Sequence, residues 1–402
     1  MNIGFYNPNY SLPVPAVGGG AVEELEEILI NQNENNSTYN FVMFQPLPTK
    51  EQMEKLSTYS YKNTKLVFIK ENKFVDLILR VFNKFFKFLH LKKRFCLSYD
   101  RNFYKLLKKH NVDRLVFEGS YPTFNIERVE KLIGRNNLYF HFHSDYTKDI
   151  KIVNNVGGLI SVSQFISNKW SDFIKEKNFE KNVNLYVLKN CVNDDKFSKR
   201  IDEQTRKDIR TSLGFCDEDF VVIFCGRILK IKGVKELMQA VCELENKNIK
   251  LLIIGSPNFS RIEKSQYLED VKNLTNNNPQ KIVFSGYIEN RNLYKYYQSA
   301  DLQVVPSTYN DPAPLVVLEG LKSALPQICT ISGGIPEYVE NGTILIDRQK
   351  DLVKNLKENI LKLYEDKDLC AKMSKINKEQ GKLFTCENFY KDFVEIMEKN
   401  NG

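Results

Sequence analysis

The stretch ADLQVVPSTYNDPAPLVVLEGLKSALPQICTISGGIPEYVENG, residues 300–342, decides the fold of this chain. Its apolar run Leu302–Val305 predicts a buried parallel strand, because strands covered on both faces are almost continuously apolar. The segment LVVLEGLKSA after Pro314 predicts a helix with proline at its start, and Pro326 ends that helix. Gln327–Thr330 predicts the next strand. This order of strand, loop, helix and strand is typical of an α/β domain with a parallel sheet.

Two carboxylates stand out in this stretch. Glu319 lies inside the apolar helix, where a buried charge needs partners, and Asp311 lies just before the helix begins. Together they indicate a polar ligand above the helix N-terminus. The alternative is that Asp311 only caps the helix and that Glu319 pairs with an internal lysine.

The same alternation runs along the whole chain, whose 402 residues favour two domains. A charged run after Asp194 predicts a linker near residues 190–205. We expect doubly wound domains at 1–195 and 196–385, and a final helix within 386–402 that packs back on the first domain. The predicted strands are Asn2–Tyr6, Tyr39–Phe44, Lys65–Ile69, Arg114–Phe117, Leu138–His143, Leu159–Val162, Leu185–Leu188, Phe220–Cys225, Leu251–Ile254, Ile282–Phe284, Leu302–Val305, Gln327–Thr330 and Thr343–Ile346.

Ligands of doubly wound sheets bind at the carboxyl ends of the strands, so two such domains facing each other would hold a ligand in a cleft. The segment VGGGAVEE follows the first strand, and Gly18, Gly19 and Gly20 would let backbone N–H groups approach an anion. A flexible loop is the alternative. The segment is not a dinucleotide fingerprint, because Glu23 stands where a third glycine is required.

Residues 225–233, CGRILKIKG, leave the predicted strand Phe220–Cys225 at its carboxyl end. Gly226 would give room there, and Arg227 and Lys232 are two cations of the kind that binds a diphosphate. The alternative is a pair of solvated surface cations.

In combination these motifs resemble glycosyltransferases of family 4, which have the GT-B fold. The second half carries the resemblance in GRILKIKG, LLIIG, IVFSGYI, DPAPLVVLEGLKSALP and SGGIPEYV, and the first half in VGGGAVE, YFHFHS, LISVS and LKNCVN. The resemblance implies two facing Rossmann-like domains with an interdomain cleft. It also implies transfer of a sugar from a nucleotide diphosphate donor, most commonly UDP-linked, to an acceptor hydroxyl, with retention at the anomeric carbon and with no metal or other cofactor.

The resemblance assigns the donor phosphates to two elements. Arg227 and Lys232, beside Gly226, would hold the diphosphate and stabilise the charge that develops on it as the anomeric bond breaks. The backbone N–H groups of Leu315 and Val316 would bind phosphate at the helix N-terminus.

Further roles follow from the same resemblance. Glu319 matches the second glutamate of the family's E-x7-E motif and would hold the ribose hydroxyls. Asp311 stands where the first glutamate contacts the transferred sugar and is one methylene shorter, and Pro314 replaces a common glycine and removes one N–H donor. The segment Gly18–Gly20 resembles the family's N-terminal loop near the phosphates and the acceptor.

Two histidines alternate on the predicted strand Leu138–His143, so His141 and His143 face the same side of it. The family places a histidine near the transferred sugar, and His143, followed by Ser144 and Asp145, fits that position better. We expect His143 to hydrogen-bond the sugar or the acceptor and not to act as a nucleophile. The alternative is that both histidines are packed polar residues.

Residues 74–95, FVDLILRVFNKFFKFLHLKKRF, combine apolar residues at helical spacing with many cations. A basic amphipathic helix is typical of membrane-surface binding, which would suit a lipid-linked acceptor at the inner membrane face. A core helix with one solvated face is the alternative. The formal net charge of +8 is too dispersed to indicate a nucleic acid partner.

The eight cysteines show no CxxC spacing and favour a reducing cytosol. Together with this localisation, the resemblance to family 4 implies a cytoplasmic hexosyl- or N-acetylhexosaminyltransferase of bacterial surface polysaccharide assembly. Because Asp311 and Pro314 depart from the family pattern, a non-catalytic, sugar-nucleotide-binding partner subunit is the alternative. A nicotinamide oxidoreductase shares this kind of sheet but needs the missing third glycine.

Overall fold

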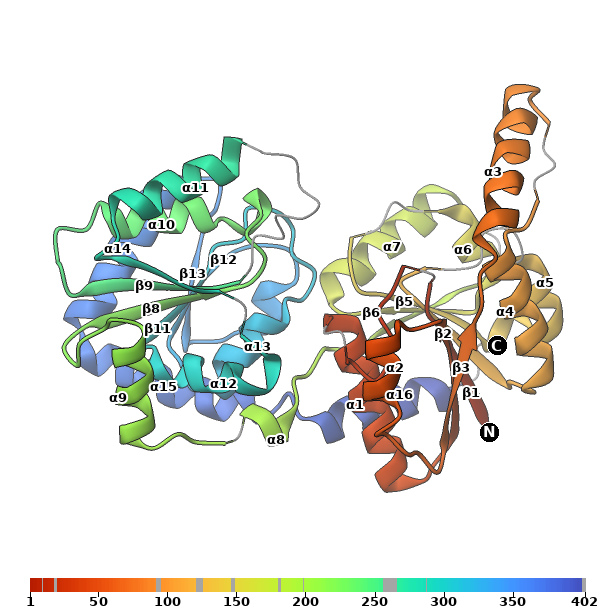
Figure 1. Cartoon of the computed structure of the whole chain (residues 1–402), viewed down its shortest axis with the longest axis horizontal. Coiled ribbons are helices and arrows are strands. Elements are labelled where there is room, and N and C mark those ends of the chain that lie inside the picture. The colour runs from red at the N-terminus through yellow and green to blue at the C-terminus, as the bar shows by residue number, and fades with distance from the viewer. Residues whose placement is uncertain are drawn as a thin grey trace. The chain divides into compact units, whose positions relative to one another are not determined.

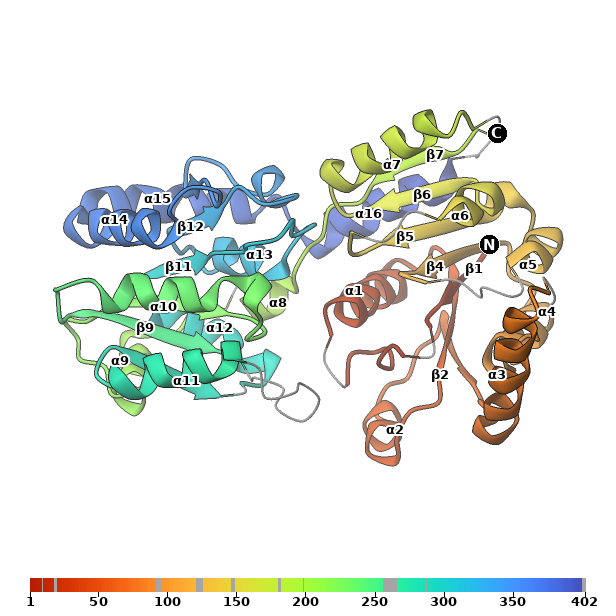
Figure 2. The same cartoon turned by 90° about the horizontal axis from the view of Figure 1, so that it is seen from above.

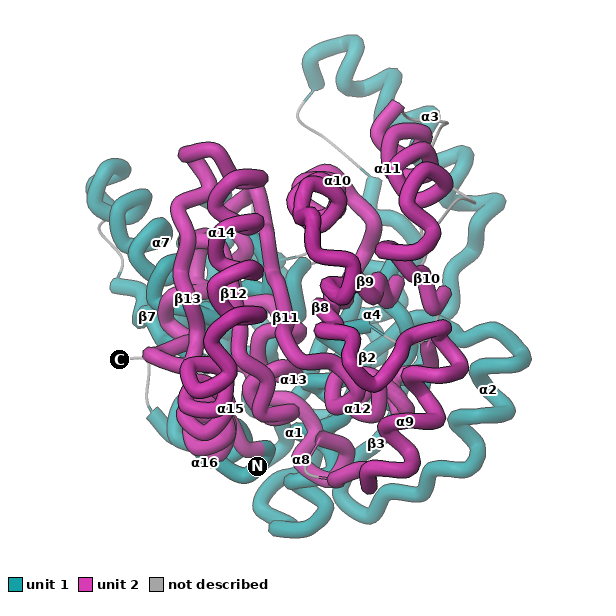
Figure 3. The backbone as a smooth tube through the Cα atoms, turned by 90° about the vertical axis from the view of Figure 1, so that its left-hand side faces the viewer, with its two compact units in different colours: residues 1–189, 386–402 teal, residues 190–385 magenta. Residues whose placement is uncertain are grey.

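The computed structural model describes residues 1–8, 10–17, 20–91, 95–120, 126–145, 149–179, 182–197, 199–255, 266–286 and 288–399. The chain forms two compact units, which Figure 3 colours separately: residues 1–189 with 386–402, and residues 190–385. Each unit is built on one parallel sheet with helices packed against it, so the predicted α/β class is confirmed.

The first unit has a seven-stranded parallel sheet in the order β3-β2-β1-β4-β5-β6-β7. Its strands are β1 Asn2–Tyr6, β2 Asn40–Pro46, β3 Thr64–Ile69, β4 Arg114–Glu118, β5 Leu138–Phe142, β6 Gly158–Ser161 and β7 Asn184–Val187. Its helices are α1 Ala21–Asn36, α2 Lys50–Leu56, α3 Lys73–Phe88, α4 Ser98–Lys109, α5 Ile126–Ile133, α6 Ile150–Asn155, α7 Gln164–Glu176 and α16 Cys386–Glu398, with a 3₁₀ turn η1 at Arg135–Asn137.

Neighbouring residues of a strand point to opposite faces of the sheet, and helices cover both faces of this one. On β1, Tyr6 packs against Phe103 of α4, with ring centroids 4.4 Å apart. Its neighbour Phe5 stacks on Phe393 of α16, with centroids 5.7 Å apart. The last helix of the chain therefore completes the core of the first unit.

The second unit has a six-stranded parallel sheet in the order β10-β9-β8-β11-β12-β13, and Figure 1 shows helices on both sides of it. Its strands are β8 Phe220–Cys225, β9 Ile249–Ile254, β10 Ile282–Gly286, β11 Leu302–Val305, β12 Gln327–Thr330 and β13 Thr343–Ile346. Its helices are α8 Asp194–Phe197, α9 Glu203–Ser212, α10 Val234–Cys242, α11 Gln266–Asn277, α12 Asn290–Ser299, α13 Leu315–Lys322, α14 Leu352–Glu365 and α15 Lys367–Gly381, with 3₁₀ turns η2 Lys230–Lys232 and η3 Ile335–Glu337.

The stretch 190–205, expected as a linker, lies within the second unit. The chain divides after Lys189, earlier than the expected boundary after residue 195. The reason is visible at Asn190, whose backbone N–H donates to the Tyr338 hydroxyl at 3.0 Å and whose side-chain amide donates to the Ala313 carbonyl at 3.0 Å. These bonds fix the start of the second unit beside the loop that leads into α13.

A buried pair of glutamines fastens α13 to the sheet. Gln303 of β11 donates to the Val316 carbonyl at 2.8 Å, and Gln327 of β12 donates to the Val317 carbonyl at 2.8 Å. The Gln327 amide also donates to Gln303 Oε1 at 2.6 Å. Gly320 is required at this crossing, because a Cβ there would overlap the Gln303 amide. The N-terminal turn of α13 is thus held at a fixed height above the strands.

Candidate active site

The loop after β8 brings a lysine to the carboxyl edge of the second sheet. Gly226 and Gly233, at its two ends, have φ values of 149° and 69°, in the region that favours glycine. A Cβ on Gly233 would also collide with the Pro306 carbonyl. The loop therefore lies against the segment after β11. Between the glycines Arg227 is exposed, while Lys232 is half-buried.

Lys232 and Asp311 form an ion pair at this edge. Lys232 Nζ donates to Asp311 Oδ2 at 2.6 Å and to the Tyr309 hydroxyl at 3.1 Å. The Ser307 hydroxyl donates to the same carboxylate at 3.3 Å. Asp311 does not cap α13, since Pro314 holds the N-cap position and supplies no side-chain hydrogen bond. That part of the alternative interpretation is wrong.

The loop after β12 fixes the backbone of Asp311. The backbone N–H of Gly334 donates to the Asp311 carbonyl at 2.8 Å. Gly333 has φ of 56°, and a Cβ there would overlap the Asp311 backbone. The two glycines of SGGIPE thus serve the placement of Asp311.

Glu319 is buried within α13, with 6% of its surface exposed. The Tyr297 hydroxyl of α12 donates to Glu319 Oε2 at 2.7 Å. Burial and the neighbouring Cys225 and Glu319 raise the pKa of Tyr297 well above its usual value. Tyr297 therefore stays a neutral hydroxyl donor that holds the carboxylate in place.

The helix that carries Glu319 opens at this same edge of the sheet. Pro314, Leu315 and Val316 are half-buried there. The first N–H groups of a helix have no partner within it, so the backbone of Leu315 and Val316 is suited to an anion. Pro314 carries no N–H group to add to them.

Of the N-terminal glycines, Gly20 lies directly before α1 with φ of 118°. Gly18 and Gly19 lie outside the described residues. A Cβ on Gly20 would overlap the Glu23 carboxylate, which accepts a hydrogen bond from the Leu12 backbone at 2.9 Å. Within the described residues, this loop is therefore folded back on the first turn of α1.

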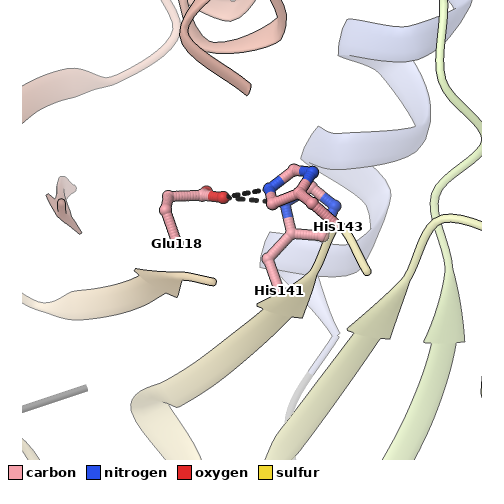
Figure 4. Close-up of side chains that lie close together, drawn as sticks. All are labelled: Glu118, His141 and His143. Carbon is pink, nitrogen blue, oxygen red and sulfur yellow. Dashed lines mark hydrogen bonds and ion pairs between the residues drawn. The ribbon is translucent and has the colours of Figure 1, made fainter. Parts of the chain in front are cut away.

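The predicted histidine site contains a third residue that the sequence motifs did not single out, Glu118 at the end of β4. His141 Nδ1 and His143 Nε2 lie 3.1 Å and 2.6 Å from Glu118 Oε2 (Figure 4). Glu118 and His141 are buried, and the His143 side chain is 9% exposed. The strand ends at Phe142, so His143 follows β5 directly.

Burial alone would raise the pKa of Glu118, but the two histidines hold it down at about 2. Burial, and then the neighbouring His141, lower the pKa of His143. Glu118 is thus ionised near neutral pH, and burial favours the neutral form of the His143 ring. Glu118 lies in no sequence motif. It comes to this site because the parallel pairing of β4 and β5 makes it the neighbour of His141.

Within the described residues, Glu118, His141 and His143 form the one group of three or more His, Cys, Asp or Glu side chains that could hold a metal ion. Two ligand atoms of a tetrahedral zinc ion would lie about 3.3 Å apart, given metal–ligand bonds of roughly 2 Å. The separation of 2.6 Å between Glu118 and His143 is shorter and fits a hydrogen bond.

The helix predicted at 74–95 is α3, and its apolar residues are not in a core. Figure 1 shows its far end extending beyond the other elements of the first unit. The core-helix alternative is wrong, and Lys92, Lys93 and Arg94 lie outside the described residues. The most exposed apolar side chains are Phe74 at 73%, Leu77 at 63%, Val81 at 61%, Phe85 at 53% and Phe88 at 78%. No described helix is both long and apolar enough to cross a bilayer.

Comparison with known proteins gives the class. Residues 205–380 match the family model described as Glycosyl transferases group 1. The structure of Anabaena HepE in complex with UDP-glucose has a TM-score of 0.72 over 98% of each chain, at 15% identity. The fold is therefore GT-B. The second unit carries a group 1 glycosyltransferase domain, as the resemblance to family 4 implied.

Two curated relatives match part of the chain. A glycosyltransferase of Methanocaldococcus jannaschii is 31% identical over 39% of this chain and 38% of its own length. A lipopolysaccharide 1,2-N-acetylglucosaminetransferase of Salmonella typhimurium is 29% identical over 33% of this chain and 36% of its own length. The chain thus aligns with little more than a third of the length of each of these relatives.

Proposed function

We propose that the protein is a retaining glycosyltransferase that moves a hexosyl or N-acetylhexosaminyl group from a UDP-linked donor to a hydroxyl of a glycan or lipid-linked acceptor. Bacterial surface polysaccharide assembly is the proposed setting. The observation that carries the proposal is the Lys232–Asp311 pair, which lies on the carboxyl edge of the second sheet within the matched region. The relative from Salmonella and the HepE complex with UDP-glucose support this choice of acceptor class and donor.

The proposed chemistry follows from charge. Cleavage of the anomeric bond leaves negative charge on the diphosphate, and preorganised donors stabilise it most effectively. Lys232 and Arg227 supply two cations, and Leu315 and Val316 supply backbone N–H groups. We propose that these groups compensate the diphosphate charge without a metal ion. Asp311, held by its backbone and by Ser307, would then accept a hydrogen bond from a hydroxyl of the transferred sugar.

Glu319 is proposed to bind the ribose hydroxyls of the donor. A carboxylate accepts hydrogen bonds from two neighbouring hydroxyl groups, and Tyr297 holds this one at 2.7 Å in a fixed orientation. The residue lies one helical turn beyond the phosphate-binding end of α13. The nucleoside and the diphosphate would thus be bound by one rigid element.

We also propose that α3 binds an anionic membrane surface and brings the enzyme to a lipid-linked acceptor from the cytoplasmic side. Phe74, Leu77, Val81, Phe85 and Phe88 recur at helical spacing and form one exposed apolar stripe. The exposed cations Arg80, Lys84 and Lys87 flank this stripe. Apolar burial and attraction to acidic lipids act together in such helices.

The test of the enzyme is release of UDP from a panel of UDP-sugars, with thermal stabilisation of the protein as a binding readout. We expect at least one donor to stabilise the wild type and to be slowly hydrolysed. Lys232→Ala and Glu319→Gln should abolish that hydrolysis, whereas Lys230→Ala, at an exposed neighbouring lysine, should not. Binding without turnover of any donor or acceptor would favour the non-catalytic partner subunit. Full activity of Lys232→Ala and Glu319→Gln would refute the proposed site.

A further inference from the structure

A row of buried polar residues crosses the carboxyl edge of the first sheet. The register pairs Glu118 with His141, and it pairs Tyr6 with Phe117, so that Asn7 comes next to Glu118. Neighbouring residues in a parallel register project to the same face. This face is covered by α1, where Glu26 accepts a hydrogen bond from the Asn7 amide at 3.0 Å. Glu118 is thus the central carboxylate of a polar layer under α1.

The negative charge of this layer resides on Glu118. Burial, then the charges of Glu118 and Glu23, raise the pKa of Glu26 well above its usual value, which disfavours a negative charge on Glu26. The two histidines instead lower the pKa of Glu118. An ionised carboxylate only accepts hydrogen bonds. Both rings that contact Glu118 Oε2 must therefore donate an N–H to it.

This requirement fixes which nitrogen of each ring faces Glu118 with a proton. His141 donates from Nδ1. His143 carries its proton on Nε2, which leaves Nδ1 as an acceptor. His141 Nε2 is buried and has no hydrogen-bond partner among the described residues. The Glu118 contact thus leaves Nδ1 of the neutral His143 ring as a hydrogen-bond acceptor.

We propose that Glu118 is a positioning residue that fixes His143 in the Nε2–H tautomer, so that His143 Nδ1 accepts a hydrogen bond from a substrate hydroxyl. The sugar hydroxyls of a glycosyl acceptor are the donors that such a nitrogen requires. This inference rests on the proposed function. Glu118 itself touches no substrate in this arrangement and acts through the ring orientation and tautomer of His143.

The first test does not depend on activity. In the wild-type protein labelled with ¹⁵N-histidine, two-dimensional ¹H–¹⁵N correlation spectra distinguish the two tautomers of each neutral ring. We expect His141 as the Nδ1–H form and His143 as the Nε2–H form. Glu118→Gln should convert one or both rings to a mixture, because a side-chain amide both donates and accepts. Unchanged tautomers in Glu118→Gln would overturn the proposal.

The second test is kinetic. Glu118→Gln should lower kcat/KM for the acceptor by roughly 10- to 100-fold, the range for one mismatched hydrogen bond, and Glu118→Asp should recover part of it. His143→Asn places an amide oxygen near the position of Nδ1. In that background Glu118→Gln should lower kcat/KM for the acceptor by less than about threefold. An equal loss in both backgrounds would show a merely structural role for Glu118.

Donor binding separates this inference from the proposed function. Thermal stabilisation by the UDP-sugar should be the same in the wild type and in Glu118→Gln, because the donor residues lie in the second unit. If no UDP-sugar stabilises the wild type, the proposed function fails whatever the tautomers are. If the donor binds and Glu118→Gln transfers sugar at the wild-type rate, the inference alone fails.

Discussion

Lys232 Nζ lies 2.6 Å from Asp311 Oδ2, although 79 residues separate the two in the chain. The pair is largely removed from water, with 18% of the lysine side chain and 5% of the aspartate side chain exposed. The contacts with Asp311 and Tyr309 hold the lysine side chain in place before a ligand arrives. The loop after β8 and the loop after β11 are therefore preorganised around one cation and one anion.

Asp311→Ala should lower the free energy of unfolding by about 2–4 kcal/mol, because loss of one partner leaves a poorly solvated charge behind. Chemical denaturation measures this change. Glu51→Ala removes the exposed partner of Lys55 and should change stability by less than about 1 kcal/mol. Equal effects of the two substitutions would contradict the burial of the Lys232–Asp311 pair.

Gly333→Ala should destabilise the protein by more than about 2 kcal/mol, since the added Cβ overlaps the Asp311 backbone and φ is positive. Gly214→Ala is the matched control. Its φ is 79° but nothing lies within 4 Å of the added Cβ, so only the backbone cost of about 1 kcal/mol should remain. Thermal unfolding measures the loss of stability in both variants. Similar losses of stability would mean that Asp311 is not held by this loop.

Gln327→Leu should weaken donor binding as well as stability. The substitution removes the bonds to Val317 and Gln303 that hold α13, and each buried unpaired polar group costs about 1–3 kcal/mol. The double variant Gln303→Leu/Gln327→Leu should lose less than the sum of the two single variants, because the pair acts as one unit. Additive losses would show that the two amides act independently.

Membrane binding by α3 is tested by co-flotation with phosphatidylcholine vesicles, with and without phosphatidylglycerol. The wild type should float only with the acidic vesicles and should be released by salt. Phe85→Asp/Phe88→Asp should remain in solution, whereas Leu383→Asp, at a residue 60% exposed in the second unit, should float as the wild type does. Flotation of the α3 variant would contradict the proposed surface.

Asp100 gives a pH dependence with a defined sign. Burial raises its pKa from 3.8 to about 6, against the effect of the Tyr6 hydroxyl, which donates to it. Between pH 3.8 and about pH 6 the native state therefore binds more protons than the unfolded state, so this residue lowers stability as the pH rises through that window. Asp100→Asn should thus raise the melting temperature more at pH 7.5 than at roughly pH 4.5. An equal shift at both pH values would contradict the raised pKa.

Much of the fold could be predicted from the sequence, because short apolar runs in a doubly wound chain are buried on both faces. Each predicted strand overlaps an observed one. Five have the observed bounds: Asn2–Tyr6, Phe220–Cys225, Leu302–Val305, Gln327–Thr330 and Thr343–Ile346. The linker near 190–205 was misplaced, because a charged run resembles a solvated connection. Nothing local to the sequence shows that Asn190 bonds to a residue 148 positions away.

The candidate site was only partly predictable. Lys232, Asp311 and Glu319 lie in recognisable motifs, but the pairing of Glu319 with Tyr297 depends on the packing of α12 on α13. Glu118 lies in no motif, and its role depends on the register between β4 and β5. Contacts between strands and helices that are distant in sequence decide which charges meet, and single-sequence patterns carry little information about them.

The affinity of the protein for UDP, measured by titration calorimetry on the wild type, Lys232→Ala and Lys230→Ala, addresses the donor site most directly. Loss of one charge-assisted bond to the diphosphate should weaken binding of Lys232→Ala by roughly 10- to 100-fold. Lys230→Ala should bind UDP as the wild type does. Equal affinities of all three proteins, or no binding of UDP by the wild type, would contradict a diphosphate site at Lys232.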